Sequence, residues 1–306
     1  MLKYVAISTA AKAFSLNDTT KSAYRRLGNV VLEKMRVSGG INQPYLDRAA
    51  RLVDYCDRLE LLAPGDRVLE LGTGWVHWEA TVLRLFFDVE VTLYDVWDNR
   101  LLGAYTSWLG QLHDRIDAAF AHLPAERRAQ AKKIARQAMQ VRTFEELYET
   151  LNFDYVVDPT GALEGVRRNH YALAVSADVL EHVQGEQLPD YLSAMRRCLV
   201  PGGASVHQID LVDHFHYFDV GTSPKNYYRY ADETWRRWFE SDVQYFNRIQ
   251  RPEWIRLFAD AGFELRVADT VSERLAPLKL APAYRDLATE DLECMQLLTV
   301  HRNPGS

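Results

Sequence analysis

The sequence predicts an α/β fold built around an open, largely parallel sheet. Short apolar runs of strand length alternate with amphipathic stretches of helical period, as in repeated strand–helix–strand units. The runs are mainly apolar, as expected for strands that are buried in the sheet. Four of the first five runs also end at a carboxylate. Ligands of such sheets bind at the carboxyl ends of the strands, so we expect a site along that edge.

The individual elements follow from the pattern in chain order. Residues 19–60 are predicted to form two helices, the second beginning near Pro44, and Pro64-Gly65 marks the turn after them. Strands are expected at 67–72, 89–95, 153–158, 171–178 and 201–211, with two closing strands at 263–273 and 293–302. Further helices are expected at 78–87, 189–199 and 251–263.

Two long segments interrupt this alternation. Residues 100–151 are charged and helical with a break at Pro124, and residues 211–250 form an irregular, aromatic-rich loop. We interpret both as insertions in a main domain at 61–306, preceded by an N-terminal helical cap at 1–60. The 100–151 helices are expected either to cover the ligand site or to form the face of a homodimer.

The composition disfavours several classes of protein. A formal net charge of −6 argues against general nucleic-acid binding, which needs a basic face. The apolar runs are shorter than the ~20 residues of a membrane span, and the N-terminus lacks the continuous apolar core of a signal peptide. The three cysteines lie far apart without a C-x-x-C pair, as in reduced proteins. These features predict a cytoplasmic protein that acts on a small molecule.

A glycine loop follows the first strand, in the segment VLELGTG. The dinucleotide fingerprint G-x-G-x-x-G would place its last glycine at position 77, where this chain has His77. A bulky residue there hinders close approach to a pyrophosphate, which disfavours NAD or FAD. S-adenosylmethionine (SAM) has no phosphate, but its ammonium group, ribose diol and adenine amine all suit acidic partners. Glu70, Asp95 and Asp158 are the acids expected to meet these three groups, in that order.

Four segments together resemble class I SAM-dependent methyltransferases. They are VLELGTG, VTLYD, VSADVLEHV and MRRCLVPGG, within residues 60–300. The resemblance implies a seven-stranded Rossmann-like sheet closed by an antiparallel hairpin, with SAM as methyl donor and S-adenosylhomocysteine as product. It also implies cofactor contacts from Glu70, Gly72, Thr73, Gly74, Asp95, Asp158 and Asp178. The chain departs from the family at Val76, where many members have a further glycine.

Three bulky residues, Trp75, His77 and Trp78, stand where the loop runs into the first helix. One expectation is that the Trp rings pack under this helix. The alternative is that Trp75 or His77 faces the methionine end of SAM and shapes the acceptor pocket.

Two groups of residues are candidates for activating an acceptor hydroxyl, which needs a base or a metal. The first is Asp178, Glu181 and His182, which share one face if a helix begins there. In some ubiquinone-pathway O-methyltransferases a similar segment holds a divalent metal, but many relatives carry the same letters without one, so none is expected. The second group follows the fifth strand and comprises His207, Asp210, Asp213, His214, His216 and Asp219. His214 or His207 is the predicted base, His182 is a further catalytic candidate, and a metal site in this second group is the alternative.

The loop after the fifth strand interleaves aromatic side chains with Arg and Lys. Most of the aromatics are expected to form a small sub-core, but loops of this length are often binding loops. The predicted substrate contacts are Asp213, His216, Tyr217, Arg229 and Arg248. Such a loop suits a sugar with anionic groups or a small carboxylate-bearing acceptor. It resembles methyltransferases of bacterial glycan and secondary metabolism.

The leading hypothesis is methyl transfer to a hydroxyl of a small polar acceptor, such as a sugar or glycan precursor. The alternative is S- or N-methylation of an amino-acid-like molecule, which requires positioning but no base. A non-catalytic SAM-binding module is disfavoured by the intact Glu70, Gly72, Gly74 and Asp95. A dinucleotide oxidoreductase is disfavoured by His77 in the glycine loop.

Overall fold

A computed structural model describes residues 2–15, 17, 19–20 and 39–305, and most of the first helix expected within 19–60 lies outside the described residues. The strands are β1 (Asp66–Leu71), β2 (Val89–Asp95), β3 (Phe153–Val157), β4 (Tyr171–Ala177), β5 (Leu199–Asp210), β6 (Glu264–Ser272) and β7 (Cys294–Arg302). They form one seven-stranded sheet in the order β3-β2-β1-β4-β5-β7-β6. The seven expected strands are therefore confirmed.

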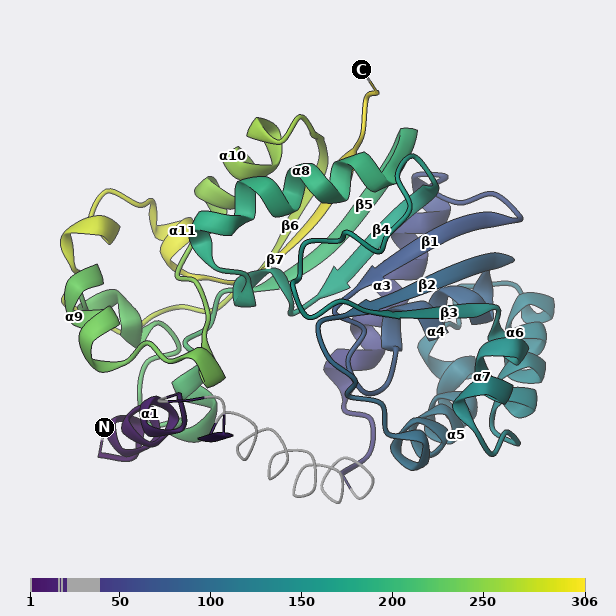
Figure 1. Ribbon diagram of the computed structural model, residues 1–306, viewed down its shortest axis with the longest axis horizontal. Coiled ribbons are helices and arrows are strands. Elements are labelled where there is room, and N and C mark those ends of the chain that lie inside the picture. The colour runs from purple at the N-terminus through teal and green to yellow at the C-terminus, as the bar shows by residue number, and fades with distance from the viewer. Residues whose placement is uncertain (1, 16, 18, 21–38, 306) are drawn as a thin grey trace.

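The sheet is parallel except at β7. Strands β1 to β5 pair in parallel, with Val68 opposite Val91 in the β1–β2 pair. β7 runs antiparallel to both β5 and β6, with His207 opposite Thr299 in the β5–β7 pair. This confirms the Rossmann-like sheet with a closing antiparallel hairpin, and it brings the carboxyl ends of β1 to β5 to one edge (Figure 1).

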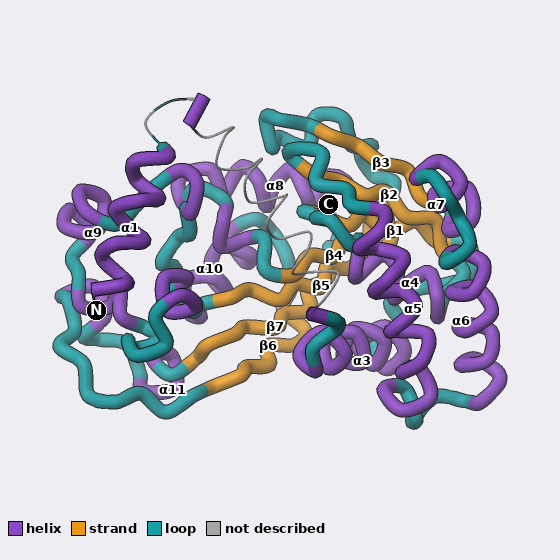
Figure 2. Tube along the Cα trace, turned by 90° about the horizontal axis from the view of Figure 1, so that it is seen from below, coloured by secondary structure: helices purple, strands orange, loops and turns teal. Residues whose placement is uncertain are grey.

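Helices cover both faces of the sheet (Figure 2). One core contains side chains of α3 (Gln43–Arg58), α4 (Trp78–Phe86), α5 (Leu102–Ala119), α6 (Ala125–Ala138) and α7 (Phe144–Leu151). The opposite core contains side chains of α8 (Leu188–Cys198) and α10 (Arg251–Asp260). The helices begin where the sequence supplies caps: the Asn42 side chain accepts from Tyr45 N at the start of α3, and Thr143 accepts from Glu146 N at the start of α7.

The helices α5 to α7 account for the 100–151 segment and pack into the main core. Tyr105, Trp108 and Phe120 are buried there beside α3 and α4 side chains. The segment therefore buries apolar surface against the sheet domain, which explains why its charged residues alternate with large apolar ones.

A third, aromatic core lies at the other end of the molecule. It joins Tyr4 of α1 (Leu2–Phe14) to Phe215, Tyr227 and Trp235, the last from α9 (Asp232–Trp238). The short helix α11 (Thr289–Leu292) contributes Leu292. Figures 1 and 2 both show α1 beside α9 and far from α5–α7. The 211–250 loop is thus largely folded around its own aromatics, with α1 packed on it.

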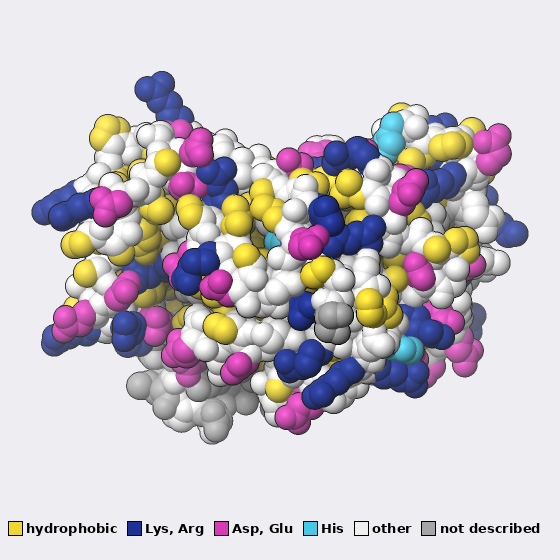
Figure 3. Space-filling model, turned by 90° about the horizontal axis from the view of Figure 1, so that it is seen from above, with side chains coloured by type: hydrophobic (Ala, Val, Ile, Leu, Met, Phe, Trp, Pro, Cys, Tyr) yellow, Lys and Arg dark blue, Asp and Glu magenta, His cyan; other side chains and the backbone are white. Residues whose placement is uncertain are grey.

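Surface features agree with the composition. On the face drawn in Figure 3, acidic and basic side chains are interspersed rather than gathered by sign. Within the described residues, no helix combines the length and apolar character that crossing a membrane requires.

Candidate active site

The loop between β1 and α4 requires glycine at two positions. Gly72 and Gly74 have φ angles of +65° and +61°, in the left-handed region that glycine adopts without strain. A Cβ on Gly72 would lie 2.5 Å from the side chain of Val179, so a larger residue does not fit without a shift. The Gly72 amide donates to the Tyr94 carbonyl at 2.8 Å, which ties the loop to β2.

A cavity of about 570 Å³ opens beside this loop at the carboxyl edge of the sheet. The residues that line it include Gly72, Asp95, residues 160–162 and Tyr191 of α8. Asp95 is buried at the end of β2, and its carboxylate accepts from the amides of Gly74 at 2.9 Å and Val96 at 2.8 Å. Burial raises the pKa of Asp95. The cavity suits an extended polar ligand lying across the strand ends.

Glu70 and Thr73, two of the expected cofactor contacts, are buried and are not among the residues that line this cavity. Glu70 is buried and accepts from the amides of Glu79 at 3.0 Å and Ala80 at 3.1 Å, so it caps the start of α4. The Thr73 hydroxyl donates to Glu70 and lies 2.8 Å from Nδ1 of His77. Burial, followed by the nearby Glu79, raises the pKa of Glu70. The hydrogen bonds of these two residues therefore stabilise the conformation of the loop.

The three bulky loop residues pack inward. His77 begins α4 with φ +46°, is buried, and places Nε2 3.1 Å from the Tyr148 hydroxyl. Burial lowers the pKa of His77 to about 3, so its ring stays neutral. Trp75 and Trp78 lie edge-on to Trp108 of α5, with ring centroids 4.7 and 5.9 Å from it. The Trp rings thus fill the space between α4 and α5.

Two further acids of the sheet edge are held by their own neighbours. Asp158 accepts from the Tyr94 hydroxyl at 2.9 Å and from the Thr160 hydroxyl at 2.6 Å, which shapes the turn that lines the cavity. Asp178 has φ +57° and pairs with Arg48 of α3 at 2.7 Å. Its other oxygen accepts from Gln208 at 3.0 Å.

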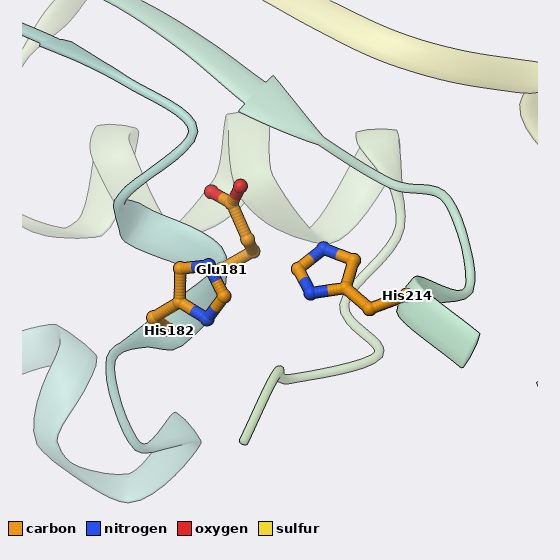
Figure 4. A group of neighbouring side chains, drawn as sticks. All are labelled: Glu181, His182 and His214. Atoms are coloured by element: carbon orange, nitrogen blue, oxygen red, sulfur yellow. The ribbon is translucent and has the colours of Figure 1, made fainter. Parts of the chain in front are cut away.

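One carboxylate and two imidazoles lie close together (Figure 4), and one of these imidazoles lines the cavity. Glu181 and His182 come from the short 3-10 helix η1 (Leu180–His182), and His214 begins η3 (His214–Phe218) after β5. One ligand atom of each of the three residues lies within 4.8 Å of the others. His182 also lines the 570 Å³ cavity. Two residues of the first sequence-predicted group and one of the second therefore meet here, and we call these three residues the Glu–His–His cluster.

His214 is backed by a carboxylate. Its Nε2 lies 3.5 Å from Oδ2 of Asp210, which is buried at the end of β5. The same carboxylate accepts from the Tyr217 hydroxyl at 2.6 Å. The His214 ring stacks on Phe246 at a centroid distance of 4.5 Å. These contacts fix the orientation of the imidazole plane beside His182.

His207 lies elsewhere. It is buried within β5, with Nδ1 2.8 Å from the Ser176 hydroxyl and its ring 5.3 Å from that of Phe258 in α10. Burial, and then His301, lower the pKa of His207 well below its usual value. The structure therefore does not bring His207 to the cavity.

The five expected substrate residues take different places. Asp213 is buried and accepts from the Tyr4 hydroxyl at 2.7 Å and the Phe215 amide at 3.0 Å, and burial raises its pKa to about 6. His216 has Nδ1 2.9 Å from the Thr222 carbonyl. Tyr217 is exposed beside His214. Arg229 is exposed, whereas Arg248 pairs with Asp232 and lines a second cavity of about 420 Å³.

Comparison with known proteins identifies the family. A family model described as a methyltransferase domain matches residues 45–267, which is more than half of the chain. The chain belongs to this methyltransferase family. Together with the strand order, this makes the protein a class I SAM-dependent methyltransferase. A search of curated proteins finds no match.

Solved methyltransferase structures are similar at low sequence identity. Phosphoethanolamine N-methyltransferase 2 of Haemonchus contortus, solved with SAM, matches 72% of this chain and 38% of its own, at 16% identity and a TM-score of 0.43. A SAM-dependent methyltransferase of Methanosarcina mazei matches 81% and 97%, at 13% identity and 0.49. The 1,6-didemethyltoxoflavin N1-methyltransferase of Burkholderia thailandensis matches 92% and 84%, at 14% identity and 0.45. This chain thus spans well under half of the Haemonchus enzyme.

SAM is the cofactor of this methyltransferase, and the residues around the 570 Å³ cavity fit it. Gly72 lies in the cavity wall, where a Cβ would clash with Val179, another residue of that wall. Asp95 presents an acid to the same cavity, where it would hold the ribose hydroxyls. The turn at 160–162 is placed to enclose the adenine end. When bound, SAM supplies a methyl group on a positively charged sulfur.

Arg48 was not singled out from the sequence. It is largely buried, pairs with Glu79 and Asp178 at 2.7 Å each, and links α3 to the motif at the end of β4. Burial alone would lower the pKa of Arg48, but the two carboxylates outweigh it and raise the pKa. An Arg on the polar face of an amphipathic helix gives no sequence signal for such a role.

Proposed function

We propose that this methyltransferase transfers a methyl group from SAM to a hydroxyl of a small polar acceptor, such as a sugar or glycan precursor. The observation that carries the proposal is the position of His214, whose ring lies 5.0 Å from that of the cavity-lining His182 and has the Asp210 carboxylate behind it. Methylation of an alcohol needs help in removing its proton, and an imidazole oriented by a carboxylate is a common way to provide it.

Each residue near the transferred methyl group would have a separate role. The acceptor hydroxyl would lie between the Glu–His–His cluster and the methyl group, so that its oxygen attacks the carbon as the carbon–sulfur bond breaks. The bonding electrons stay on sulfur, and the hydroxyl proton passes to His214. Asp210 holds the ring by its 3.5 Å contact. Tyr217, exposed beside this ring, is placed to cover one face of a sugar.

A panel of acceptors tests this proposal. Purified protein is incubated with methyl-labelled SAM and with matched small molecules that offer a hydroxyl, an amine or a thioether. We expect label in the hydroxyl compounds, at the oxygen. Label found in amines or thioethers alone would overturn the O-methyl assignment.

N- or S-methylation of an amino-acid-like molecule is the second candidate, and one observation favours it. The buried Glu181 carboxylate lies among the cluster without a hydrogen-bond partner in the described residues, and it is the kind of group that accepts a hydrogen bond from a neutral acceptor amine. This reaction needs no base. Retention of the full rate after both His207 and His214 are replaced would support it against the hydroxyl reaction.

The wider setting completes the proposal. The net charge of −6 favours a small-molecule substrate over nucleic acid, and three buried free cysteines agree with a cytoplasmic location. The division into a cap at 1–60 and a domain at 61–306, and the homodimer, stay predictions.

A further inference from the structure

Glu181 is a buried carboxylate that lacks compensation. It is 1% exposed, and neither carboxylate oxygen has a hydrogen-bond partner among the described residues. Asp178 and Asp210 are its acidic neighbours. Arg48, the cation that pairs with Asp178, is also engaged by Glu79. A buried carboxylate in such surroundings is stable only with a proton or with a bound cation.

The two imidazoles are oriented as metal ligands usually are. Nδ1 of His182 lies 2.7 Å from the Tyr245 carbonyl, which can only accept, so Nδ1 carries the proton and Nε2 keeps its lone pair. Nε2 of His214 makes no hydrogen bond among the described residues, but the charge of the Asp210 carboxylate, 3.5 Å away, favours the proton on Nε2 and leaves the lone pair on Nδ1. A ring N–H directed at a carbonyl or carboxylate is the typical outer contact of a metal-bound histidine.

The distances between the ligand atoms of the cluster suit a single bound ion. The ligand atoms of Glu181, His182 and His214 lie within 4.8 Å of one another. Ligands about 2.1 Å from a tetrahedral ion are ~3.4 Å apart, so modest side-chain rotations close the site. His182 also lines the cofactor cavity, which leaves that side open for a further ligand.

The geometry points to a divalent metal site formed by Glu181, His182 and His214. Two imidazoles and one carboxylate favour a first-row transition metal such as Zn²⁺ or Mn²⁺ over Mg²⁺, which prefers oxygen ligands. The metal site does not depend on the proposed function, whereas the catalytic role of the metal rests on it. A bound ion would also change the role proposed for His214: the imidazole would act as a ligand, and the ion would take over as the group that lowers the pKa of an acceptor hydroxyl, whose proton would pass to water.

Metal titration of the full chain tests the site. Chelator-treated protein is titrated with ZnCl₂ or MnCl₂ by calorimetry, and bound metal is counted after gel filtration. We expect one equivalent, with at least about 100-fold weaker binding in Glu181→Gln and His214→Gln, since loss of an outer contact alone costs about 10- to 100-fold. His122→Gln, at an exposed histidine outside the cluster, is the matched control and should bind like the parent.

Two results would overturn the site: no saturable binding of either metal, or binding that survives unchanged in both cluster variants. Circular dichroism of the variants shows whether they fold, and His182→Gln provides a third variant if one does not. Because this titration uses no acceptor, its failure is distinct from failure of the hydroxyl assignment. If the protein binds metal but methylates only amines, the result would support the metal site and refute the proposed function.

Discussion

Two buried histidines between the sheet and α10 predict a specific sensitivity to acid. His301 of β7 is 1% exposed, and its ring stacks on Phe258 at a centroid distance of 3.9 Å. Neither of its ring nitrogens has a hydrogen-bond partner among the described residues. Burial lowers the pKa of His301 to about 3. The pKa of His207, in the neighbouring strand, is lowered in the same way.

The direction and size of the change in the free energy of unfolding follow from proton linkage. Below the ordinary histidine pKa of about 6.5, the unfolded chain binds a proton at His301 and the folded protein does not. The stability that this neutral histidine contributes is therefore full above pH 6.5 and falls as the pH drops towards 3. Between pH 6.5 and 5.0 the loss is about 2 kcal/mol, at 1.36 kcal/mol for each pH unit. His301→Phe, which keeps the aromatic stack, removes this loss.

Urea unfolding at pH 7.5 and pH 5.0 measures the effect. The free energy of unfolding of His301→Phe should fall by about 2 kcal/mol less than that of the parent over this interval. His301→Leu serves as a second variant if Phe is too large for the site, and His122→Gln, at an exposed position, should keep the parental pH dependence. An equal loss in the parent and in both His301 variants would refute the reasoning.

Three further predictions concern the cofactor loop and the His214 loop. Gly72→Ala, with φ +65° and a Cβ 2.5 Å from Val179, should weaken S-adenosylhomocysteine binding at least about tenfold by calorimetry, and parental affinity would contradict this. Asp95→Ala should weaken the same binding by about 1.5–3 kcal/mol, the usual contribution of hydrogen bonds to a charged group. Tyr4→Phe removes the 2.7 Å hydrogen bond to buried Asp213 and should lower the free energy of unfolding by about 1–3 kcal/mol, whereas an unchanged urea midpoint would show that the bond contributes nothing.

Much of the fold could be predicted because periodicity reports burial directly. The continuous apolar runs ending at Asp95 and Asp178 mark strands covered on both faces, and the glycine loop marks the first turn at the sheet edge. The helices of 100–151 were also predictable, but their packing was not. Apolar residues at helical spacing, such as Trp108, do not say which neighbouring surface they cover.

The site was harder to predict because the type of a residue does not reveal which way its side chain points. β5 is buried on both faces, so no alternation of polar and apolar residues distinguishes the face of His207 from the edge where His214 follows. Asp213 has the composition of a ligand residue, yet its hydrogen bonds from Tyr4 and Phe215 support a loop. The meeting of His182 with His214 depends on two loops that only the folded sheet brings together.

The rate of methyl transfer to a hydroxyl acceptor in two histidine variants tests the central claim most directly. His214→Gln should lower kcat by about 100-fold or more, the usual contribution of an activating acid–base group, with the KM for SAM little changed. His207→Asn, compared at equal folded fraction, should keep the parental kcat because His207 lies within the core. A His214→Gln enzyme with the parental kcat, or a His207→Asn enzyme that folds but is inactive, would contradict the assignment.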